Sequence, residues 1–334
     1  MEKPIYATLT SIGAYVPSRI VTNEDLSKIV DTSDEWITKR TGIKERRFAE
    51  GNEATSDLAT KAARLALKRA NLEASEIDAV IVATISPDFF CMPSTACVVA
   101  NNLGILDKPA FDIAAACSGF IYLLSLAKSF IESKTYKNIL IIGAEKISSI
   151  LDMQDRSTCV LFGDGAGAAV ISATEDKNLS VLDVRCSSNG QYQEFLMTPG
   201  CGSRNPASVE ILQERLQFIK MKGNETFKIA VKTLTKDVVE ILAKNNLSKD
   251  DIDFFIPHQA NLRIISAVGE ALGFPNEKVA LVVQKYGNTS AASIPMAIND
   301  LYENGKIQCG SRLLLDAFGG GLTWGSAILT FNGK

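Results

Sequence analysis

The chain has 334 residues, of which 46% are hydrophobic and 22% are charged, and its formal net charge at pH 7 is −3. This length allows a large core and two domain-sized halves, whereas a slightly acidic charge argues against a general nucleic-acid binder, which normally carries a basic surplus. No run reaches the roughly 18 to 20 apolar residues that cross a bilayer, and we see no secretory signal at the N-terminus.

Residues 31–43, D-T-S-D-E-W-I-T-K-R-T-G-I, are the first informative segment. Thr32 and Glu35 have the spacing of a capping box, which predicts a helix that begins there. Trp36 and Arg40 are four residues apart and therefore share a face of that helix. The pair is either a buried indole beside a solvated guanidinium or a clamp for a flat ligand such as adenine.

Residues 111–120, F-D-I-A-A-A-C-S-G-F, predict a strand that stops in small residues and is followed by a helix. Cys117 would then lie at the start of the helix, where free N–H groups and the helix dipole favour the thiolate. Its small neighbours would allow a substrate carbonyl to approach. The alternative is a buried structural cysteine, one of seven in a chain that has no C-x-x-C and that we expect to be reduced and cytoplasmic.

The two halves of the chain read alike. Residues 71–84 and 246–259 share Asn-Leu, an acidic turn, Ile-Asp and a buried-strand pattern, after predicted helices at 57–70 and 227–245. The glycine-rich residues 162–171 likewise resemble 318–329, and both read as turns into strands rather than as a dinucleotide fingerprint. The repeat predicts two similar βαβαβ halves, residues 1–175 and 176–334.

Two further polar residues fall at predicted strand ends in the second half. His258 follows a strand that ends at Pro257 and precedes a helix predicted at 261–270, and Asn288 lies in the turn equivalent to that of Cys117. Ligands of open α/β sheets bind beyond the carboxyl ends of strands, so we expect these three side chains to share a cleft. His258 is suited to acid–base work or is a core histidine; Asn288 either stabilises an oxyanion or makes a turn.

Six segments in order resemble one family: D-T-S-D-E-W-I-x-x-R-T-G-I, A-A-A-C-S-G-F, F-G-D-G-A-G-A-A-V, P-H-Q-A-N-L-R-I-I, G-N-T-S-A-A-S and F-G-G-G-x-T-W-G-S. The sequence is similar over nearly its whole length to bacterial β-ketoacyl-acyl-carrier-protein (ACP) synthase III, in the thiolase superfamily. The resemblance implies an α/β fold whose thiolase-like halves form a five-layered αβαβα core. It implies initiation of type II fatty acid synthesis from acyl-CoA, most simply acetyl-CoA, and malonyl-ACP.

The resemblance also implies roles for individual residues. Cys117 matches the nucleophile, His258 and Asn288 match the pair that stabilises the enolate, and the N–H groups of Cys117 and Gly320 match the oxyanion hole. The remaining positions match the coenzyme A site (Trp36, Arg40, Arg156, Asn261), the acyl pocket (Phe162, Met92) and the basic carrier-protein site (Arg263, Lys228). Further implications of the resemblance are a homodimer built on residues 89–100, no metal and no redox cofactor. The charge and the lack of a long apolar run separately predict no nucleic-acid and no membrane partner.

Some positions depart from the family pattern, and some functions stay open. Met92 stands where relatives often carry Phe, Glu270 stands where some carry Lys, and residues 201–217 look longer than usual. The sequence therefore leaves open the acyl-CoA primer and the strength of carrier-protein docking. A homologous condensing enzyme of a polyketide or quinolone pathway stays an alternative, as do a thioester hydrolase and a non-catalytic acyl-CoA-binding protein.

Overall fold

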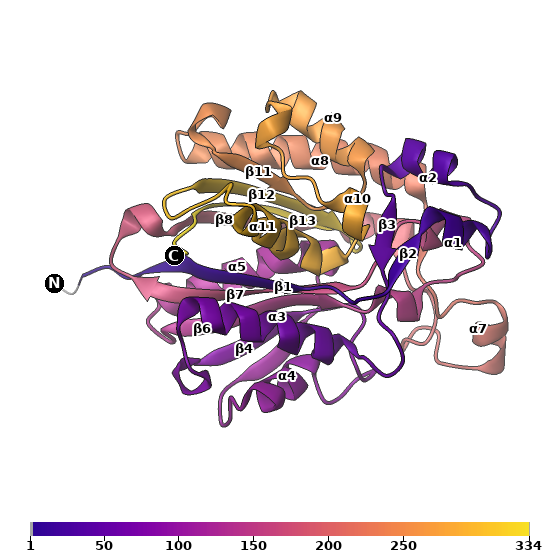
Figure 1. Ribbon diagram of the computed structural model, residues 1–334, viewed down its shortest axis with the longest axis horizontal. Helices are drawn as coiled ribbons and strands as arrows, with labels where there is room; N and C mark the ends of the chain where they lie inside the picture. The colour runs from indigo at the N-terminus through magenta and orange to yellow at the C-terminus, as the bar shows by residue number, and fades with distance from the viewer. Residues whose placement is uncertain (1–2, 334) are drawn as a thin grey trace.

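Five layers of secondary structure stack in the computed structural model, which describes residues 3–333 (Figure 1). Helices α3 and α4 cover the outer face of one sheet, and α8 and α9 cover the outer face of the other. Helices α5 and α11 lie between the two sheets and contact both. The expected αβαβα arrangement is therefore confirmed.

The first sheet has the strand order β1-β7-β6-β4-β5. Its strands are β1 (Tyr6–Tyr15), β4 (Ala79–Ala83), β5 (Ala110–Ile113), β6 (Asn138–Glu145) and β7 (Gly165–Thr174). The β4, β5 and β6 strands are parallel, whereas β7 is antiparallel to β6 and β1. Because helices cover both faces of this sheet, the β4 sequence A-V-I-V-A is buried along its whole length.

The second sheet has the same strand order, but a single bridge stands in place of its fifth strand. Its order is β8-β13-β12-β11, with β8 (Val181–Ser188), β11 (Phe254–Pro257), β12 (Arg312–Gly319) and β13 (Thr323–Thr330). At the place of β5, a single parallel bridge joins Val279 to Phe255. The strands of the first sheet come from residues 6–174 and those of the second from 181–330; a domain boundary at residue 175 stays a prediction.

The helices and small strands complete the described chain. The helices are α1 (Asn23–Ser27), α2 (Asp34–Thr41), α3 (Thr55–Ala70), α4 (Thr95–Leu103), α5 (Gly119–Glu132), α6 (Arg156–Cys159), α7 (Val209–Gln213), α8 (Gly223–Lys244), α9 (Leu262–Leu272), α10 (Val283–Tyr286) and α11 (Ser293–Glu303). Two short hairpins pair β2 (Ile20–Thr22) with β3 (Glu45–Arg47), and β9 (Leu196–Met197) with β10 (Lys220–Met221).

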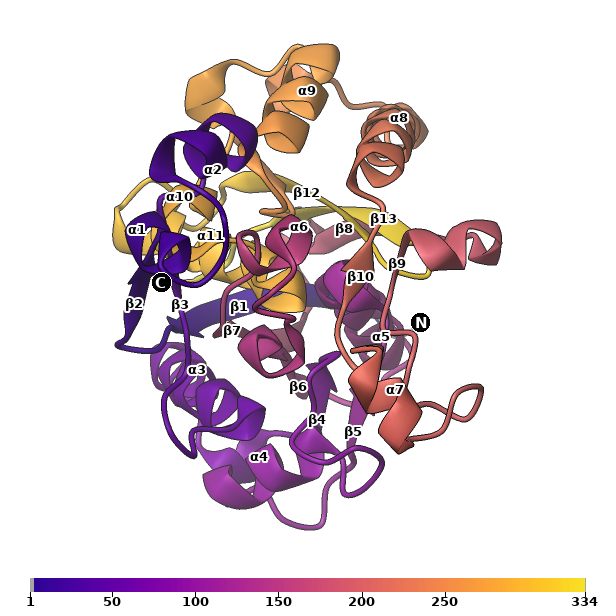
Figure 2. The ribbon, with the colours of Figure 1, turned by 90° about the vertical axis from the view of Figure 1, so that its right-hand side faces the viewer.

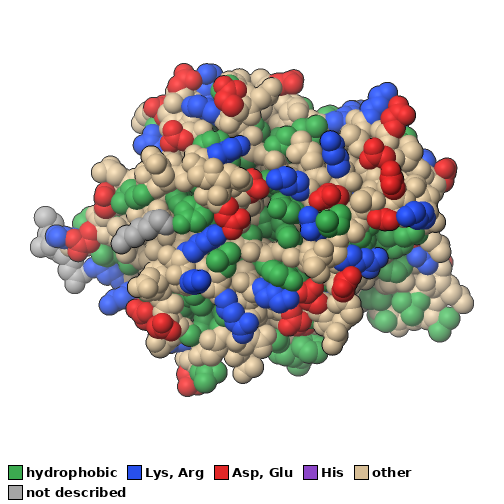
Figure 3. Space-filling model, viewed as in Figure 1, with side chains coloured by type: hydrophobic (Ala, Val, Ile, Leu, Met, Phe, Trp, Pro, Cys, Tyr) green, Lys and Arg blue, Asp and Glu red, His purple; other side chains and the backbone are tan. Residues whose placement is uncertain are grey.

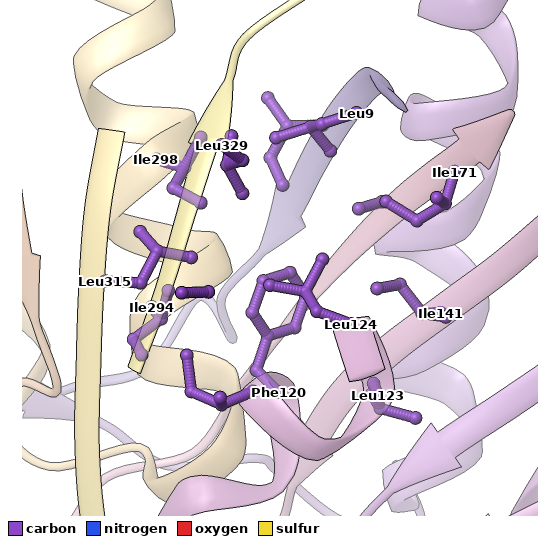
Figure 4. Close-up of a cluster of buried hydrophobic side chains, with 14 of the residues drawn as sticks. Leu9, Phe120, Leu123, Leu124, Ile141, Ile171, Ile294, Ile298, Leu315 and Leu329 are labelled. Atoms are coloured by element: carbon purple, nitrogen blue, oxygen red, sulfur yellow. The ribbon is translucent and has the colours of Figure 1, made fainter. Parts of the chain in front are cut away.

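The core between the sheets holds the two halves together. Figure 4 shows Phe120, Leu123 and Leu124 of α5 pointing into the same apolar space as Ile294 and Ile298 of α11. Leu9, Ile141 and Ile171 of the first sheet and Leu315 and Leu329 of the second close this space. The two buried helices are thus fixed by both sheets, which fixes the turns at their N-termini.

Some predicted boundaries were wrong. The N-cap of α2 is Ser33 and not Thr32, because the Ser33 hydroxyl accepts a hydrogen bond from the Trp36 N–H at 3.1 Å. The Thr32 hydroxyl is buried without a hydrogen-bond partner among residues 3–333. Helices α3 and α8 begin two and four residues before their predicted starts, at Thr55 and Gly223.

The apolar residues 89–100 divide into an exposed and a buried part. Phe90 and Met92 are exposed, Met92 by 80%, whereas Ala96, Val99 and Ala100 pack against the outer face of the first sheet.

Acidic and basic side chains intermingle on the face of the molecule seen in Figure 3. In the part of the chain that the structure describes, none of the helices combines the length and the apolar character needed to cross a membrane.

Candidate active site

Residues of α2, α6 and the start of α9 line a cavity of about 410 Å³. Figure 2 shows how these helices are arranged at this end of the molecule. The walls of the cavity come from α2, α6, α8, the start of α9 and the turns that precede α5 and α11. Among the predicted site residues, those that line it are Trp36, Arg40, Cys117, Arg156, Phe162, His258, Asn261, Arg263 and Asn288. Residues separated by up to 252 positions in the sequence thus share one cavity, whose size suits a small-molecule ligand.

Cys117 lies in a tight 3₁₀ turn, Ala116–Ser118, directly before α5. The turn begins with Ala116 at φ 45°, a left-handed conformation that is uncommon for a residue other than glycine. Small residues are required around it: a Cβ on Gly319 would lie 2.6 Å from the Cys117 nitrogen, and one on Gly119 would lie 2.6 Å from the Ala83 Cβ. The glycines therefore allow two strand ends to close around the cysteine.

The same turn occurs in the second half. Ser290 has φ 50° and opens the 3₁₀ turn Ser290–Ala292 before α11, as Ala116 does before α5. This match makes Ala291 the counterpart of Cys117. Asn288 therefore lies just before the equivalent turn, three residues before the equivalent position. The two turns contact each other, which brings Asn288 and Cys117 to one cavity.

Cys117 as a residue is only 5% exposed, and this burial determines the pKa of its thiol. Burial, with a smaller contribution from the charge of Glu145, raises the pKa of the thiol to about 12, although the Ser290 hydroxyl acts in the opposite direction. The loss of solvent thus outweighs the polar groups at the helix start, which by themselves favour the thiolate. Acylation of this sulfur needs a group that accepts its proton.

His258 directly follows β11, and its imidazole is held from one side. Its Nδ1 lies 2.6 Å from the Ser293 Oγ, at the start of α11. The Nε2 is buried and has no hydrogen-bond partner among the described residues, and the ring lines the cavity. Burial lowers the pKa of His258 to about 3, so the ring is neutral at physiological pH.

The contacts of Ser293 favour one tautomer of the His258 ring. The Ser293 Oγ accepts a hydrogen bond from the Gln259 backbone N–H at 3.3 Å, which leaves the hydroxyl hydrogen free to donate to Nδ1. The Nε2 then carries the imidazole hydrogen and is a donor into the cavity. Gln259 fixes the loop, because its amide donates to Pro257 and Ala280 carbonyls and accepts from Val282 and Val283.

The Asn288 side chain is also oriented as a donor. Its Oδ1 accepts a hydrogen bond from the Ser290 N–H at 2.9 Å, while its backbone forms hydrogen bonds to Leu161 and Gly163. The Nδ2 has no acceptor within residues 3–333, and the residue lines the cavity. The arrangement therefore presents an amide N–H₂ and an imidazole N–H, both uncharged, to a bound oxygen.

The turn that contains Gly320 is tied to the turn of Cys117. Thr323 donates a hydrogen bond from its hydroxyl to the Ala115 carbonyl at 2.9 Å, and Ser118 donates to the Thr323 carbonyl at 3.0 Å. A Cβ on Gly320 would lie 2.9 Å from the Leu196 carbonyl oxygen. These contacts hold the backbone of Gly320 near Cys117 without placing its N–H relative to a ligand.

The Trp36 indole lines the cavity, and two arginines lie close to its ring. The guanidinium carbons of Arg40 and Arg156 lie 4.6 and 4.7 Å from the ring centre. Arg156 also donates to the Asp31 carbonyl at 2.8 Å. The result is a flat aromatic surface with two positive charges, which suits a phosphorylated, flat ligand.

The other predicted residues have varied surroundings. Asn261 is the N-cap of α9, and its side chain accepts from the Ile264 N–H. Arg263 lies over the Phe227 ring at 5.2 Å, and Phe162 forms a backbone bridge with Asn288. Lys228 lines a separate groove with Lys232 and Lys236 of α8, and Met92 lies outside the cavity.

Residues 201–217 form a projecting loop that carries α7 (Figure 1). Arg215 anchors its end through two hydrogen bonds to Asp152, of 2.9 and 2.6 Å. These bonds hold the pKa of Asp152 well below its usual range. The C-terminal end of the loop is therefore fixed to the body of the protein through Asp152.

The sequence did not predict three residues that surround the site, namely Ser293, Gln259 and Glu145. Ser293 and Gln259 fall within quoted motifs, but their partners lie 35 and 21 to 24 positions away in the chain. Glu145 ends an apolar strand with no local sign of a function, yet its charge acts on Cys117. Among the described residues, no group of three or more His, Cys, Asp or Glu side chains could hold a metal ion.

Comparison with known proteins identifies the family. Sequence models of 3-oxoacyl-[acyl-carrier-protein] synthase III match residues 111–190, and those of its C-terminal region match 242–331. β-Ketoacyl-[acyl-carrier-protein] synthase III of Campylobacter curvus is 64% identical over 98% of both chains. The 3-oxoacyl-[acyl-carrier-protein] synthase III structure from Aquifex aeolicus is 48% identical with a TM-score of 0.90, over 97% of this chain and all of the other.

A structure from a different pathway is also similar. The priming β-ketosynthase of the R1128 polyketide pathway has a TM-score of 0.92 and 31% identity, over 100% of this chain and 98% of its own. The fold and these likenesses define a thiolase-fold condensing enzyme, that is, an acyltransferase. The chain belongs to the 3-oxoacyl-[acyl-carrier-protein] synthase III family.

Proposed function

We propose that this condensing enzyme initiates type II fatty acid synthesis by joining an acyl group from acyl-CoA to malonyl-ACP, with acetyl-CoA as the simplest primer. The observation that carries the proposal is the shared cavity of Cys117, His258 and Asn288, with Trp36 and two arginines at its rim. The products are 3-oxoacyl-ACP, coenzyme A and carbon dioxide.

In the first half-reaction Cys117 attacks the thioester carbonyl of acyl-CoA. The new sulfur–carbon bond replaces the bond to coenzyme A, so the acyl group stays activated as a thioester. The N–H groups of Cys117 and Gly320 stabilise the oxyanion that forms during the attack. The close approach of the two segments supports this role. Because Gly319 has no Cβ, the backbone next to Gly320 can lie against the Cys117 nitrogen.

In the second half-reaction malonyl-ACP loses carbon dioxide and its enolate attacks the acyl group on Cys117. Decarboxylation supplies the carbon nucleophile, so the reaction requires neither an external base nor a metal or redox cofactor. His258 and Asn288 donate to the enolate oxygen from Nε2 and Nδ2. Their free, cavity-facing nitrogens and the lowered pKa of His258 support these roles.

The substrates bind at distinct parts of the surface in this proposal. The coenzyme A nucleotide lies against Trp36, Arg40 and Arg156, with Asn261 farther along the cavity. The acyl chain lies beside Phe162. The acidic carrier protein docks on Arg263 and Lys228, and the exposed Glu270 on α9 weakens or shifts that contact.

The assembled enzyme is a homodimer in this proposal. The exposed Phe89, Phe90 and Met92 provide an apolar surface that a second copy would cover, and Met92 then reaches the partner's acyl pocket. The seven cysteines are all free, which supports a reducing compartment such as the cytoplasm.

The test is a reconstituted reaction with acyl-CoA and malonyl-ACP. We expect 3-oxoacyl-ACP and free coenzyme A from the native chain and neither from Cys117→Ser. Release of free acid without condensation would favour a thioester hydrolase. Tight acyl-CoA binding without turnover, unchanged in Cys117→Ser, would favour a binding protein.

A second candidate is a priming ketosynthase of a polyketide pathway. The likeness to the R1128 enzyme favours it, and it differs in the carrier protein and primer rather than in the chemistry. Competition between a fatty-acid carrier protein and a polyketide carrier protein, each loaded with malonyl, distinguishes the two candidates.

A further inference from the structure

Glu145 is a fully buried carboxyl group behind the active-site turn, at the end of β6. Its Oε2 accepts hydrogen bonds from Ser86 Oγ at 2.6 Å and from Thr84 Oγ1 and the Ile85 N–H, both at 3.1 Å. Its Oε1 has only a 3.3 Å contact with the same Ile85 N–H. One oxygen is therefore well satisfied and the other retains capacity to accept a proton.

The turn Ser290–Ala292 lies between Glu145 and Cys117. It contacts both β6 and the Ala116–Ser118 turn, and a Cβ on Gly143 of β6 would lie 2.2 Å from the Ala291 carbonyl oxygen. The Ser290 hydroxyl is buried and forms no hydrogen bond of normal geometry within the described residues. The turn that carries this hydroxyl packs against both the strand of Glu145 and the turn of Cys117, and the hydroxyl lowers the pKa of each of these two groups.

The two possible proton acceptors near the thiol differ in strength. Burial lowers the pKa of His258 to about 3, and its Nδ1 is occupied by Ser293. Burial raises the pKa of Glu145 to about 7. A base whose pKa lies near the working pH accepts a proton far more readily than the imidazole does.

The surroundings of Glu145 contain little other charge. The strands and turns packed on it contribute Thr84, Ser86, Gly165 and Ser290, and the thiol of Cys117 is the titratable group that feels its charge. Its charged neighbours face other partners, since Lys146 donates to the Glu53 carbonyl, and Asp164 accepts from Ser148 and Ala49.

We propose that Ser290 and Glu145 form a proton path behind Cys117, which holds the thiol proton between the two half-reactions. The inference rests on the proposed function. When the Cys117–acyl bond forms and the bond to coenzyme A breaks, the thiol proton passes to Ser290 Oγ, and the proton of Ser290 passes to the Glu145 carboxylate. Coenzyme A leaves as a thiolate with the electron pair.

Condensation returns the proton. The enolate carbon forms its bond to the acyl carbonyl, and Cys117 leaves as a thiolate. Glu145 then gives its proton to Ser290, and Ser290 gives its own to the sulfur. Each group ends the cycle in the state in which it began.

The test is the rate of Cys117 acylation by acetyl-CoA, followed by rapid quench and intact-protein mass from pH 6 to 8.5. For the native chain we expect a rate that rises with pH through about 7. Glu145→Gln and Ser290→Ala should acylate at least 10-fold more slowly at pH 7.5, and Glu145→Gln should lose the rise. Alanine suits position 290, since Ala116 adopts the same conformation in the first half.

Thr84→Val is the matched control, because it removes a hydrogen bond to Glu145 without interrupting the path. The Thr84 hydrogen bond lowers the pKa of Glu145, so this variant should keep the rise and shift it to higher pH. A flat native profile overturns the proposal even if no variant folds, and so does Glu145→Gln with a native rate and profile. A native chain that forms no acyl adduct overturns the proposed function itself, and the path with it.

Discussion

The Nδ1 of His258 and the Oγ of Ser293 lie 2.6 Å apart, in a buried contact between residues 35 positions apart in the sequence. Ser293 belongs to the first turn of α11, a helix fixed between the two sheets. The imidazole therefore has one nitrogen occupied by a rigid partner and the other facing the cavity. This relationship determines how His258 acts on a bound oxygen.

Removal of the Ser293 hydroxyl should release the imidazole from its preferred tautomer. We expect Ser293→Ala to slow condensation by about 10- to 100-fold, because part of the population loses the Nε2–H donor. Acylation of Cys117 should be unaffected, and Ser293→Thr should restore part of the rate. Since His258 is the only histidine, ¹⁵N-histidine NMR reports its tautomer directly; a native Nδ1–H tautomer would contradict this account.

Replacement of His258 itself should separate the two half-reactions. We expect His258→Ala to accept an acyl group on Cys117 but to condense it with malonyl-ACP on the order of 10²–10³-fold more slowly, by analogy with the loss of an oxyanion donor. Single-turnover measurements on pre-acylated enzyme check this. Condensation at the native rate would remove His258 from the mechanism.

The burial of His258 also makes stability depend on pH. Its pKa is about 3 when folded and about 6.5 when unfolded, so the unfolded chain binds the proton first and stability falls as pH drops below 6.5. Between pH 7 and 5 this histidine should destabilise the native chain by about 2 kcal/mol relative to His258→Gln. Urea unfolding of both proteins at each pH measures the difference, and parallel curves would exclude the shifted pKa.

The aromatic rim should contribute to binding rather than to chemistry. We expect Trp36→Ala to raise the KM for acetyl-CoA by about 10-fold, which corresponds to about 1.4 kcal/mol of stacking and cation–π contact. Acetyl-pantetheine lacks the nucleotide and is the matched control substrate, for which native and variant should be equal. An equal loss with both substrates would place Trp36 in a structural role.

Carrier-protein docking should follow the charges on α8 and α9. We expect Lys228→Glu and Arg263→Glu each to raise the KM for malonyl-ACP by about 10-fold at low salt, less at high salt, because exposed charges are screened. Glu270→Lys should act in the opposite direction. Steady-state kinetics at two salt concentrations test this, and a Glu270→Lys variant with weaker docking would refute the assigned surface.

The sequence predicted the layers and the cavity residues better than the details of the site. The repeat between residues 71–84 and 246–259 indicated the two sheets, because buried strands and their helices keep a readable pattern. It did not reveal that the counterpart of Cys117 is Ala291, which depends on the left-handed Ala116 and Ser290. Local dipoles suggested a thiolate at Cys117, whereas desolvation by distant segments decides its pKa.

A local sequence pattern also predicted the wrong N-cap where two neighbouring residues could both cap a helix. Thr32 and Glu35 have capping-box spacing, but Ser33 caps α2 because its hydroxyl reaches the Trp36 N–H. The contacts of Glu145, Ser290 and Ser293 join segments far apart in the chain, and no short pattern encodes such contacts. They form only when both sheets are in place.

The most direct test of the central claim is the intact mass of the protein after brief exposure to a panel of acyl-CoAs, with Cys117→Ser as control. The account predicts one acyl adduct on the native chain and none on the variant, and the best-loaded group identifies the primer. An adduct that persists in Cys117→Ser, or no adduct with any short or branched acyl-CoA, would contradict the account.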